Sequence, residues 1–337
     1  MHLKEKGCYL GIDVGSVSTN LVVIDDDGFV IEKLYLKTGG QPIKAMRTGI
    51  SMLNESLGKS VNILGAGATG SGRHLASVVV GCDIVKNEIT SHAIAALKLV
   101  PNVKTILEIG GQDSKIIFVR NGVVYDFAMN TVCAAGTGSF LDRQAARLDI
   151  PIEEFGKHAL NSSSPVRIAG RCAVFAESDM IHKQQAGHSV EDIICGLCEA
   201  LVRNYINNLA KGKELLEPFV FQGGVAANQG IVAAFEKELN AKIIIPQYYD
   251  VMGAYGAALM AKEKMCQKEY KTNFGGFDIS KKEFTVASME CNDCSNVCEL
   301  IKIISNDTVL ASWGDRCGKW SAEGKESAQI SISNAAN

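Results

Sequence analysis

The stretch from Tyr9 to Leu36, YLGIDVGSVSTNLVVIDDDGFVIEKLYL, decides the fold. An apolar run ends in a glycine turn, and a second run LVVI, a DDDG turn and a third run FVIEKLYL follow. Apolar runs of this length, separated by glycine and aspartate turns, predict a meander of three strands.

Residues Thr105 to Met129, TILEIGGQDSKIIFVRNGVVYDFAM, repeat this plan. In the repeat Glu108, Gly110 and the run IIFV take the places of Asp13, Gly15 and the run LVVI. Each half continues into a strand, a glycine-rich loop and a helix, first in ILGAGATGSGRHLASVVV and then in FVFQGGVAANQGIVAAFEKEL. The sequence therefore predicts an α/β protein with two duplicated lobes that face a cleft.

The repeat also sets the expected boundaries of the domains. These are a first lobe at 1–100 with a helix near 250–265 packing back on it, a second lobe at 101–265, a linker at 266–288, a cysteine-rich metal-binding segment at 289–325 and a flexible tail at 326–337.

Composition excludes several classes of function. The 337 residues are 47% hydrophobic and 21% charged, as in ordinary globular proteins. The net charge is −3 without a Lys/Arg-rich block, so we expect neither nucleic acid nor an anionic membrane as a partner. The start, MHLKEKGCYLGIDVG, lacks the features of a signal peptide, which predicts a cytoplasmic protein. Eleven cysteines in that compartment indicate thiols or metal ligands rather than disulfides.

The first glycine turn has the residues that bind a polyphosphate. In GIDVGSVSTN, backbone N–H groups and short hydroxyl side chains follow a buried strand. We expect Asp13 to hold magnesium through water. The candidate nucleotide-binding residues here are Gly11, Gly15, Ser16, Ser18 and Thr19.

The second turn, EIGGQDSK, would face the first across the cleft. We expect Glu108 to match Asp13, and Gln112 and Asp113 to orient magnesium or the attacking water. Gly110 and Gly111 are candidate nucleotide-binding residues, and Lys115 is assigned only to a strand.

A third glycine loop, FQGGVAANQG, completes the cleft. Its glycines allow a flat ring to lie against the backbone, and Asn228 is expected to cap the following helix. The candidates from this loop and from CAAGTGSF are Gln222, Gly223, Gly224, Asn228, Gly136 and Gly138. Two opposed phosphate-type turns and a third glycine loop together indicate a nucleotide site.

Cys133 and Cys172 each precede an Ala-rich segment that favours a helix. A thiol at a helix N-terminus has a lowered pKa. Two such cysteines in each chain of a two-fold dimer fit the four ligands of one 4Fe-4S cluster. The alternative is that both are buried structural thiols. Cys195 and Cys198 lie on one face of an amphipathic segment, where packing is expected.

The motifs GIDVGSVSTN, EIGGQDSK, FQGGVAANQG and DVMGAYGAALMA resemble those of the acetate and sugar kinase, Hsp70 and actin superfamily. NTVCAAGTGSFLDRQAARL and GRCAVFAESDMIHK further resemble activator ATPases of 2-hydroxyacyl-CoA dehydratases and the related benzoyl-CoA reductase ATPase subunits. This resemblance covers about Tyr9 to Ala261 and implies two actin-like (ribonuclease H-like) lobes, ATP/ADP and Mg²⁺.

The same resemblance implies a dimer-bridging 4Fe-4S cluster on Cys133 and Cys172. It also implies a homodimer that receives electrons from ferredoxin or flavodoxin and passes a low-potential electron to a partner dehydratase or reductase. Two other functions stay open, namely a small-molecule kinase of the superfamily and a non-catalytic, nucleotide-gated metal scaffold.

The segment after Ala261 contains four more cysteines. CNDCSNVC has close ligand spacing, and the predicted hairpin IKIISNDTVLASWG would bring GDRCGKW back to it. We expect Cys291, Cys294, Cys298 and Cys317 to bind zinc or a second iron-sulfur cluster, with reduced structural thiols as the alternative. The chain is either a stand-alone activator or the front of a longer protein.

Overall fold

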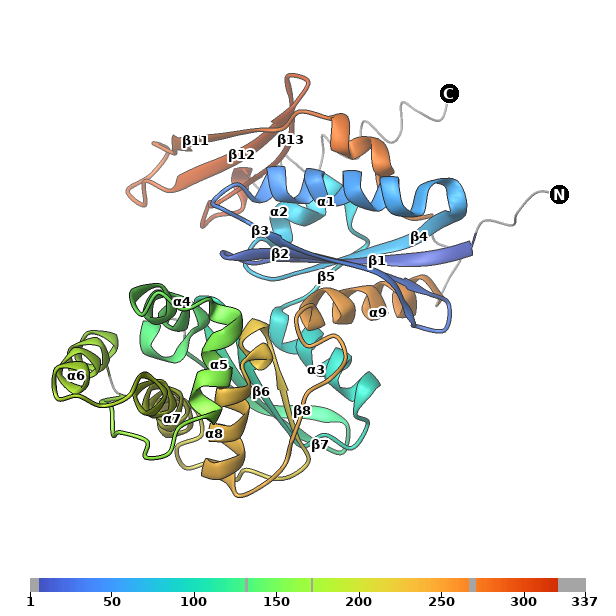
Figure 1. Cartoon of the computed structure of the whole chain (residues 1–337). Coiled ribbons are helices and arrows are strands. Elements are labelled where there is room, and N and C mark those ends of the chain that lie inside the picture. Colours follow the sequence, from blue (N-terminus) through green and yellow to red (C-terminus); the bar gives the residue numbers. More distant parts are fainter. Residues whose placement is uncertain (1–5, 131–132, 171, 267–270, 321–337) are drawn as a thin grey trace, which may run out of the picture.

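The structure is a computed structural model that describes residues 6–130, 133–170, 172–266 and 271–320. It consists of two α/β lobes and a small separate sheet (Figure 1). The predicted tail at 326–337 lies outside the described residues. No helix in the described ranges is both long enough and apolar enough to span a bilayer.

The first lobe is built around a five-stranded sheet of order β3-β2-β1-β4-β5. Its elements are β1 (Lys6–Val14), β2 (Ser18–Asp25), β3 (Val30–Lys37), α1 (Pro42–Leu57), η1 (Gly58–Ser60), β4 (Val61–Thr69), α2 (Arg73–Ala76), η2 (Ser77–Gly81), β5 (Ile84–Val85) and α3 (Glu88–Leu99).

The second lobe repeats this sheet as β10-β9-β6-β7-β8. Its elements are β6 (Thr105–Ile109), β7 (Ser114–Arg120), β8 (Val123–Asn130), η3 (Ala134–Gly136), α4 (Gly138–Arg147), α5 (Ile152–Leu160), α6 (Ala173–Gln185), α7 (Val190–Leu209), β9 (Phe219–Gln222), η4 (Gly224–Ala227), α8 (Gln229–Leu239) and β10 (Ile243–Ile244).

The duplication predicted from the sequence is confirmed strand by strand. In each sheet the first three strands are antiparallel neighbours, and the fourth strand pairs in parallel with the first. Asp13 is paired with Asn20 in the first sheet, and Glu108 is paired with Lys115 in the second. The two expected acidic residues therefore hold equivalent positions.

Helices α3 and α9 (Met252–Cys266) lie between the two sheets (Figure 1). One hydrophobic cluster joins side chains of both helices to both sheets, including Tyr9, Ile106 and Tyr255. The helix expected near 250–265 therefore does pack on the first lobe. Because they are buried on both sides, α3 and α9 form a layer that packs against both sheets.

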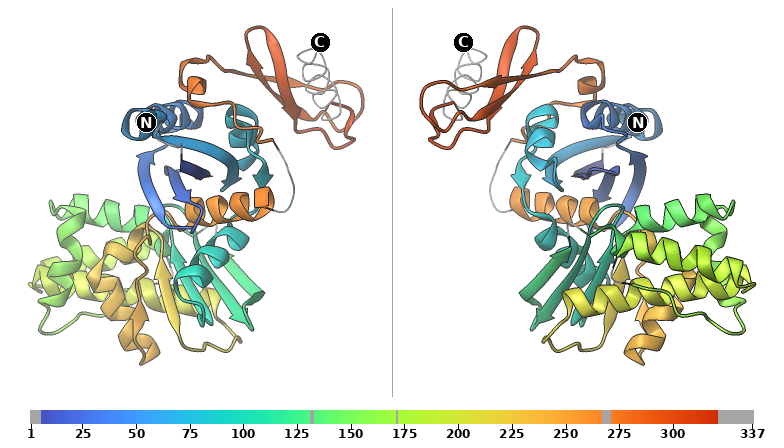
Figure 2. Two further views of the ribbon diagram at one scale, coloured as in Figure 1. Left: turned by 90° about the vertical axis from the view of Figure 1, so that its right-hand side faces the viewer. Right: turned by 90° about the vertical axis from the view of Figure 1, so that its left-hand side faces the viewer.

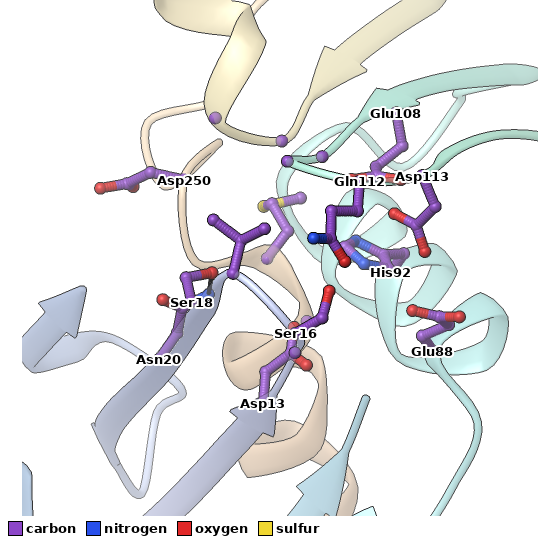
Figure 3. A pocket seen from close by; sticks show the side chains of 18 of the residues that line it. Asp13, Ser16, Ser18, Asn20, Glu88, His92, Glu108, Gln112, Asp113 and Asp250 are labelled. Carbon is purple, nitrogen blue, oxygen red and sulfur yellow. Dashed lines mark hydrogen bonds between the residues drawn. The ribbon is translucent and has the colours of Figure 1, made fainter. Parts of the chain in front are cut away.

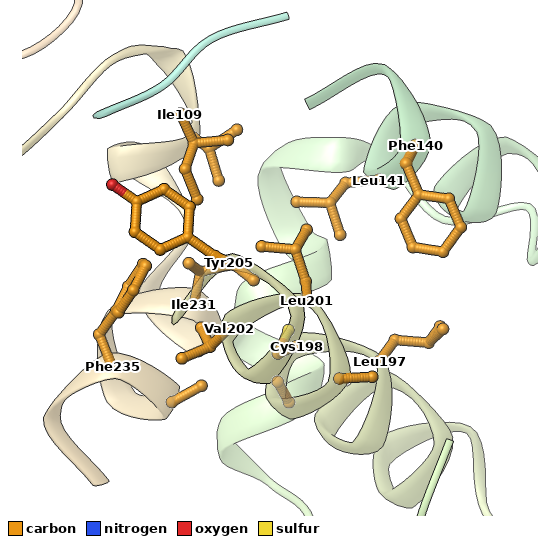
Figure 4. Close-up of a cluster of buried hydrophobic side chains, with 14 of the residues drawn as sticks. Ile109, Phe140, Leu141, Leu197, Cys198, Leu201, Val202, Tyr205, Ile231 and Phe235 are labelled. Carbon is orange, nitrogen blue, oxygen red and sulfur yellow. The ribbon is translucent and has the colours of Figure 1, made fainter. Parts of the chain in front are cut away.

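Side chains of α4 to α8 form one hydrophobic cluster with the second sheet, and Figure 4 shows part of this cluster. Tyr205 and Phe235 pack edge to face there, with ring centroids 5.3 Å apart. Cys198 is fully buried in this cluster and Cys195 packs against it. Their packing role, expected from helical spacing, is confirmed.

The predicted linker at 266–288 is not a free connection where the structure describes it. Ile279, in η5 (Phe277–Lys281), is buried against the first lobe. Asp83 accepts hydrogen bonds from the Thr272 hydroxyl (2.8 Å) and the Asn273 amide (2.7 Å). Residues 271–284 therefore belong to the first lobe.

A three-stranded antiparallel sheet follows, with β11 (Thr285–Glu290), β12 (Glu299–Ser305) and β13 (Thr308–Trp313). β12 and β13 form the predicted hairpin, with Ser305 paired to Thr308. Figure 2 shows this sheet projecting away from the first lobe.

Close contact between α9 and β1 explains one glycine that the sequence assigned to the nucleotide. A Cβ on Gly11 would lie 1.9 Å from the carbonyl oxygen of Ala254 and 2.4 Å from the amide nitrogen of Ala258. Gly11 therefore permits helix packing and does not line the cleft. This corrects its assignment as a nucleotide-binding residue.

We predict that Gly11→Ala lowers the free energy of unfolding by about 1–3 kcal/mol, because the added methyl group meets rigid backbone. Urea unfolding followed by circular dichroism measures this. Gly136→Ala is the matched control, since its Cβ would meet nothing closer than 3.4 Å. Equal stability of the two variants would contradict the packing role.

Candidate functional site: a nucleotide cleft between the lobes

Two adjoining cavities lie between the lobes. The smaller, of about 200 Å³, is lined by the ends of β1 and β6 and by the loops that follow them (Figure 3). The larger, of about 450 Å³, extends toward α4, α5 and η4. The residues that line both are Val17, Tyr35, Gly110, Gly111, Gly224, Tyr249 and Asp250. Together they form one continuous cleft with a polar and a more apolar end.

The candidate nucleotide-binding residues fall into three groups. Those in the wall of the smaller cavity are Gly15, Ser16, Ser18, Gly110, Gly111, Gly223 and Gly224. Gly138 and Asn228 line the larger cavity. Gly11, Thr19, Gly136 and Gln222 line neither.

The first loop is held by its own backbone and by two threonines. The amide of Gly15 donates to the carbonyl of Ser18 (2.8 Å). The Thr38 hydroxyl donates to the Gly15 carbonyl (2.8 Å), and it lies 2.9 Å from the hydroxyl of the fully buried Thr19. Thr19 therefore supports the loop from behind, which corrects its assignment as a nucleotide ligand.

Asp13 is enclosed by glycine backbone at the end of β1. A Cβ on Gly253, in the first turn of α9, would lie 2.0 Å from the Asp13 carboxylate, and one on Gly70 would lie 2.3 Å from it. Burial, together with the nearby carboxylates of Glu88 and Asp113, raises the pKa of Asp13 to about 7. Its carboxylate faces the smaller cavity.

The second loop surrounds a buried lysine whose role the sequence did not reveal. The ammonium of Lys115, which is 2% exposed, lies 2.9 Å from both Glu108 and Asp113 and 3.4 Å from Glu88. Burial opposes its charge, but these carboxylates outweigh that effect and raise the pKa of Lys115. Lys115 is thus a strand residue, as predicted, and also the fixed cation of the site.

Glu108 is the acidic counterpart of Asp13. Burial raises the pKa of Glu108 to about 7; the nearby carboxylates of Asp113 and Glu88 add to this rise, while Lys115 opposes it. Tyr205, on α7, fixes the strand pair behind it: its hydroxyl accepts from the amide of Glu108 (3.3 Å) and donates to the carbonyl of Lys115. The loop between β6 and β7 is therefore tied to α7.

Helix α3 contributes two further residues that the sequence analysis missed. Glu88 and His92 lie one turn apart on α3 and line the smaller cavity. Burial, together with the charge of Lys115, lowers the pKa of His92 to about 3, so this imidazole stays neutral. In the sequence, the N-cap residue Asn87 marks where α3 begins, but nothing marks that this helix lies between the two sheets.

Gln222 acts through His92. It is fully buried, and its Nε2 lies 2.8 Å from His92 Nδ1. Gln222 therefore orients a side chain of the cavity and is not itself a nucleotide ligand, which corrects its assignment.

The third loop depends on a left-handed glycine. Gly223 has φ +90°, and a Cβ there would lie 2.4 Å from the Ile109 carbonyl and 2.9 Å from the Glu108 carboxylate. Asn228 caps α8 as predicted, accepting from the Ile231 amide (3.1 Å). The Nδ2 of Asn228 is buried at the larger cavity and has no hydrogen-bond partner among the residues that the structure describes. Such an atom fits a ligand that accepts a hydrogen bond.

The charge at the polar end fits a nucleotide that carries magnesium. Asp13, Glu88, Glu108 and Asp113 face one cation, Lys115. Carboxylates are the ligands that Mg²⁺ prefers, and Mg²⁺ keeps several waters and shares its site with phosphates. Without a cation these carboxylates would repel a triphosphate.

An ion pair crosses the mouth of the cleft. Lys33, on β3, lies 2.7 Å from Asp250 of the segment before α9. Asp250 lines both cavities, and Tyr35 lies two residues beyond Lys33 on the same strand. The pair therefore closes the cleft on the side of β3.

Cys133 and Cys172 are both half-buried, and each is an N-cap. Cys172 precedes α6 directly, as expected. Cys133 instead precedes the 3₁₀ turn η3, because α4 begins only at Gly138; this corrects the expected helix position. Asn130 fixes Cys133, accepting from its amide (2.9 Å) and donating to its carbonyl (2.8 Å). η3 and α6 contact each other.

The four tail cysteines lie apart from the cleft, around one end of the β11–β13 sheet. Cys291 is buried, Cys298 is half-buried, and Cys294 and Cys317 are exposed. Among the residues that the structure describes, no three His, Cys, Asp or Glu side chains already converge on a position for an ion.

We predict that the stability of the protein without metal or nucleotide falls as pH rises toward 7. The folded pKa of Glu108, about 7, exceeds its ordinary value of 4.5. Between these values the folded state binds more protons than the unfolded chain, so the free energy of unfolding decreases with rising pH. Glu108→Gln should flatten this decrease in thermal unfolding curves recorded from pH 5 to 8. The exposed Glu238→Gln is the control, and an equal slope in both variants would contradict the prediction.

Comparison with known proteins agrees with this cleft. A family model described as the BadF/BadG/BcrA/BcrD ATPase family matches residues 10–261. The (R)-2-hydroxyglutaryl-CoA dehydratase activating ATPase of Acidaminococcus fermentans is 34% identical over 255 residues, covering 76% of this chain and 97% of that protein. The 2-hydroxyisocaproyl-CoA dehydratase activator of Clostridioides difficile is 34% identical over 270 residues, covering 78% of this chain and 98% of that protein.

A solved structure resembles the fold over the same range. The activator of 2-hydroxyisocaproyl-CoA dehydratase from Clostridium difficile with bound ADPNP has a TM-score of 0.70 and 32% identity, covering 79% of this chain and 98% of that one. The family match ends at residue 261, so the β11–β13 sheet lies beyond it.

Proposed function

Because the chain belongs to the BadF/BadG/BcrA/BcrD ATPase family, we propose that it uses ATP hydrolysis to drive a low-potential electron to a partner enzyme. The partner is a 2-hydroxyacyl-CoA dehydratase or a benzoyl-CoA reductase-like iron-sulfur enzyme, since the relatives named above are dehydratase activators. The electron leaves a 4Fe-4S cluster shared by two copies of the chain. Ferredoxin or flavodoxin is the proposed donor.

The cleft supports binding of Mg²⁺ and ATP along its length. The acidic end, with Lys115 as its fixed cation, suits the triphosphate, and the larger cavity suits the nucleoside. Gly110 and Gly111 line both cavities, and the Gly110 amide holds this turn in shape by donating to the Asp113 carbonyl (3.0 Å). The unpartnered Nδ2 of Asn228 is available to the nucleoside.

In this proposal the two lobes share the chemistry of hydrolysis. Asp13 and Glu108, one from each lobe, would hold Mg²⁺ through its waters, and Gln112 and Asp113 would orient the attacking water. The charge of Lys115 opposes the rise in the pKa of Asp13 and Glu108 that burial causes, and so favours their ionised forms. His92, neutral and held by Gln222, donates a hydrogen bond without adding charge.

The observation that carries the coupling is the position of α7. Tyr205 holds the strands that flank the phosphate loop, through Glu108 and Lys115. The preceding residue, Asn204, donates to the carbonyl of Gly170, and Arg203 donates to that of Ile168 (3.2 Å). The same turn of α7 therefore contacts both the strands that flank the nucleotide loop and the segment 168–170, which precedes Cys172 in the sequence.

The surroundings of the two cysteines fit a shared cluster. Each thiol is half-buried at the N-cap of a helical turn. When bound, a 4Fe-4S cluster supplies a one-electron carrier. Val174 and Phe175, directly after Cys172, are each 67% exposed. This apolar surface beside Cys172 is suited to a second copy of the chain.

We predict that Asp13→Asn lowers ATP turnover on the order of 10²-fold, because a charge that holds the magnesium shell is lost. Phosphate release measures turnover, and binding of a fluorescent ADP analogue checks the site. Asp27→Asn, an exposed residue outside the cleft, is the control. Turnover equal to that of the parent would refute the assignment of Asp13.

We predict that Cys133→Ser removes about two irons per chain from anaerobically purified protein, which corresponds to one four-iron cluster per dimer. Nucleotide affinity should be unchanged, and ATP-dependent electron transfer to an acceptor should be lost. Cys195→Ser, on the packed face of α7, is the control.

Full iron content in Cys133→Ser would disprove the ligand assignment. Iron loss with electron transfer intact would support the assignment of Cys133 as a cluster ligand but would disprove the proposed function.

A further inference from the structure

We propose that Cys291, Cys294, Cys298 and Cys317 bind one tetrathiolate metal centre, a zinc ion or an iron-sulfur cluster, that stabilises the β11–β13 sheet. This site lies outside the region matched by the family. It is independent of the bridging cluster and of the activator function.

The sheet has too small a core to be stable by burial alone. Among its described residues 285–320, the buried side chains are Leu300, Ile303, Cys291 and Ser312. It projects from the first lobe instead of adding to that lobe's core (Figure 2). Segments of about 40 residues or fewer usually need a disulfide, a metal or a partner chain.

The strand register brings the cysteines to one end of the sheet. Glu290 is paired with Glu299, so Cys291 and Cys298 adjoin just beyond this pair. The Cys291 amide donates to the Cys298 carbonyl (2.8 Å). β13 returns to the same end, where Gly314 passes so close that its Cβ would lie 2.2 Å from the Glu299 carbonyl.

Two side-chain contacts hold the Cys317 turn against the other three cysteines. The indole N–H of Trp320 donates to Cys291 Sγ (3.4 Å). Lys319 forms an ion pair with Asp293 (2.6 Å), the residue before Cys294. An N–H group directed at sulfur is the kind of outer contact that orients metal ligands.

The local charge suits a thiolate centre. The ammonium groups of Lys302 and Lys319 lie 4.8 Å and 5.5 Å from the centroid of the Trp320 ring. Four thiolates around a divalent ion leave net negative charge; Lys302 can offset part of it, whereas Lys319 is already paired with Asp293.

The turn from Cys294 to Cys298 has an uncommon backbone conformation. Val297 has φ +42°, a region that β-branched residues rarely adopt, and its amide donates to the Cys294 carbonyl (3.3 Å). Cys294 and Cys317 are exposed and lie in loops at the same end of the sheet as the buried Cys291.

Metal content of the full chain tests the site. The background is Cys133→Ser with Cys172→Ser, so that iron of the bridging cluster does not contribute. We expect about one zinc or about four irons per chain by elemental mass spectrometry after anaerobic purification. Adding Cys291→Ser and Cys298→Ser should reduce this metal to background. Cys266→Ser, an exposed cysteine outside the segment, should retain it.

A second measurement needs no variant in the segment. Alkylation of the metal-loaded background protein, read by peptide mass spectrometry, should spare the four tail cysteines and label Cys266; a chelator should restore their labelling. Zinc identifies an ion, and iron with visible absorption identifies a cluster. Absence of both metals after reconstitution with zinc, or with iron and sulfide, in protein that still binds nucleotide would overturn the site. Metal retained after loss of Cys291 and Cys298 would also overturn it.

Discussion

The contact of α9 with β1 and β4, made backbone against backbone, is the constraint on which the rest of the structure depends. A Cβ on Gly67 would lie 2.3 Å from the Ala257 carbonyl, and one on Gly256 would lie 1.9 Å from the Ser91 carbonyl of α3. Because no side chains separate these elements, α9 reaches the end of β1 with its first turn. Asp13 therefore meets Gly253 at the N-terminus of a helix, which favours negative charge. The same contact holds α3 in place, and with it Glu88 and His92.

The cleft joins two halves of one repeated design that carry different charge. Paired positions hold Asp13 and Asn20 in one lobe and Glu108 and Lys115 in the other. An acid in each lobe suits a cation between them, and the second lobe adds Lys115, which lies 2.9 Å from both Glu108 and Asp113. The duplicated fold thus places equivalent residues on the two sides of the cleft. Because Lys115 stands where the first lobe has Asn20, the two sides differ in charge.

The duplication, the strand order and most of the cleft residues were predictable because they depend on local patterns. Apolar runs, glycine turns and the Asn228 cap are each set by neighbours in the sequence. Glu88, His92 and the role of Lys115 were not predictable, because nothing local records that α3 lies between the sheets. Gly11 and Gly223 show the same limit. A side chain is excluded at Gly11 by α9 and at Gly223 by the end of β6. A glycine-rich sequence alone does not distinguish a glycine needed for helix packing from one that lines the cleft.

The ion pair between Lys33 and Asp250 has a kinetic consequence. Asp250 lines both cavities, so a nucleotide that enters from the side of β3 must separate these opposite charges before it is seated. Both side chains are partly exposed, so the pair contributes little to overall stability and is weakened by salt. Its influence falls on the rate at which nucleotide exchanges. Ionic strength would then change how long ADP resides in the cleft more than it changes whether ATP fits.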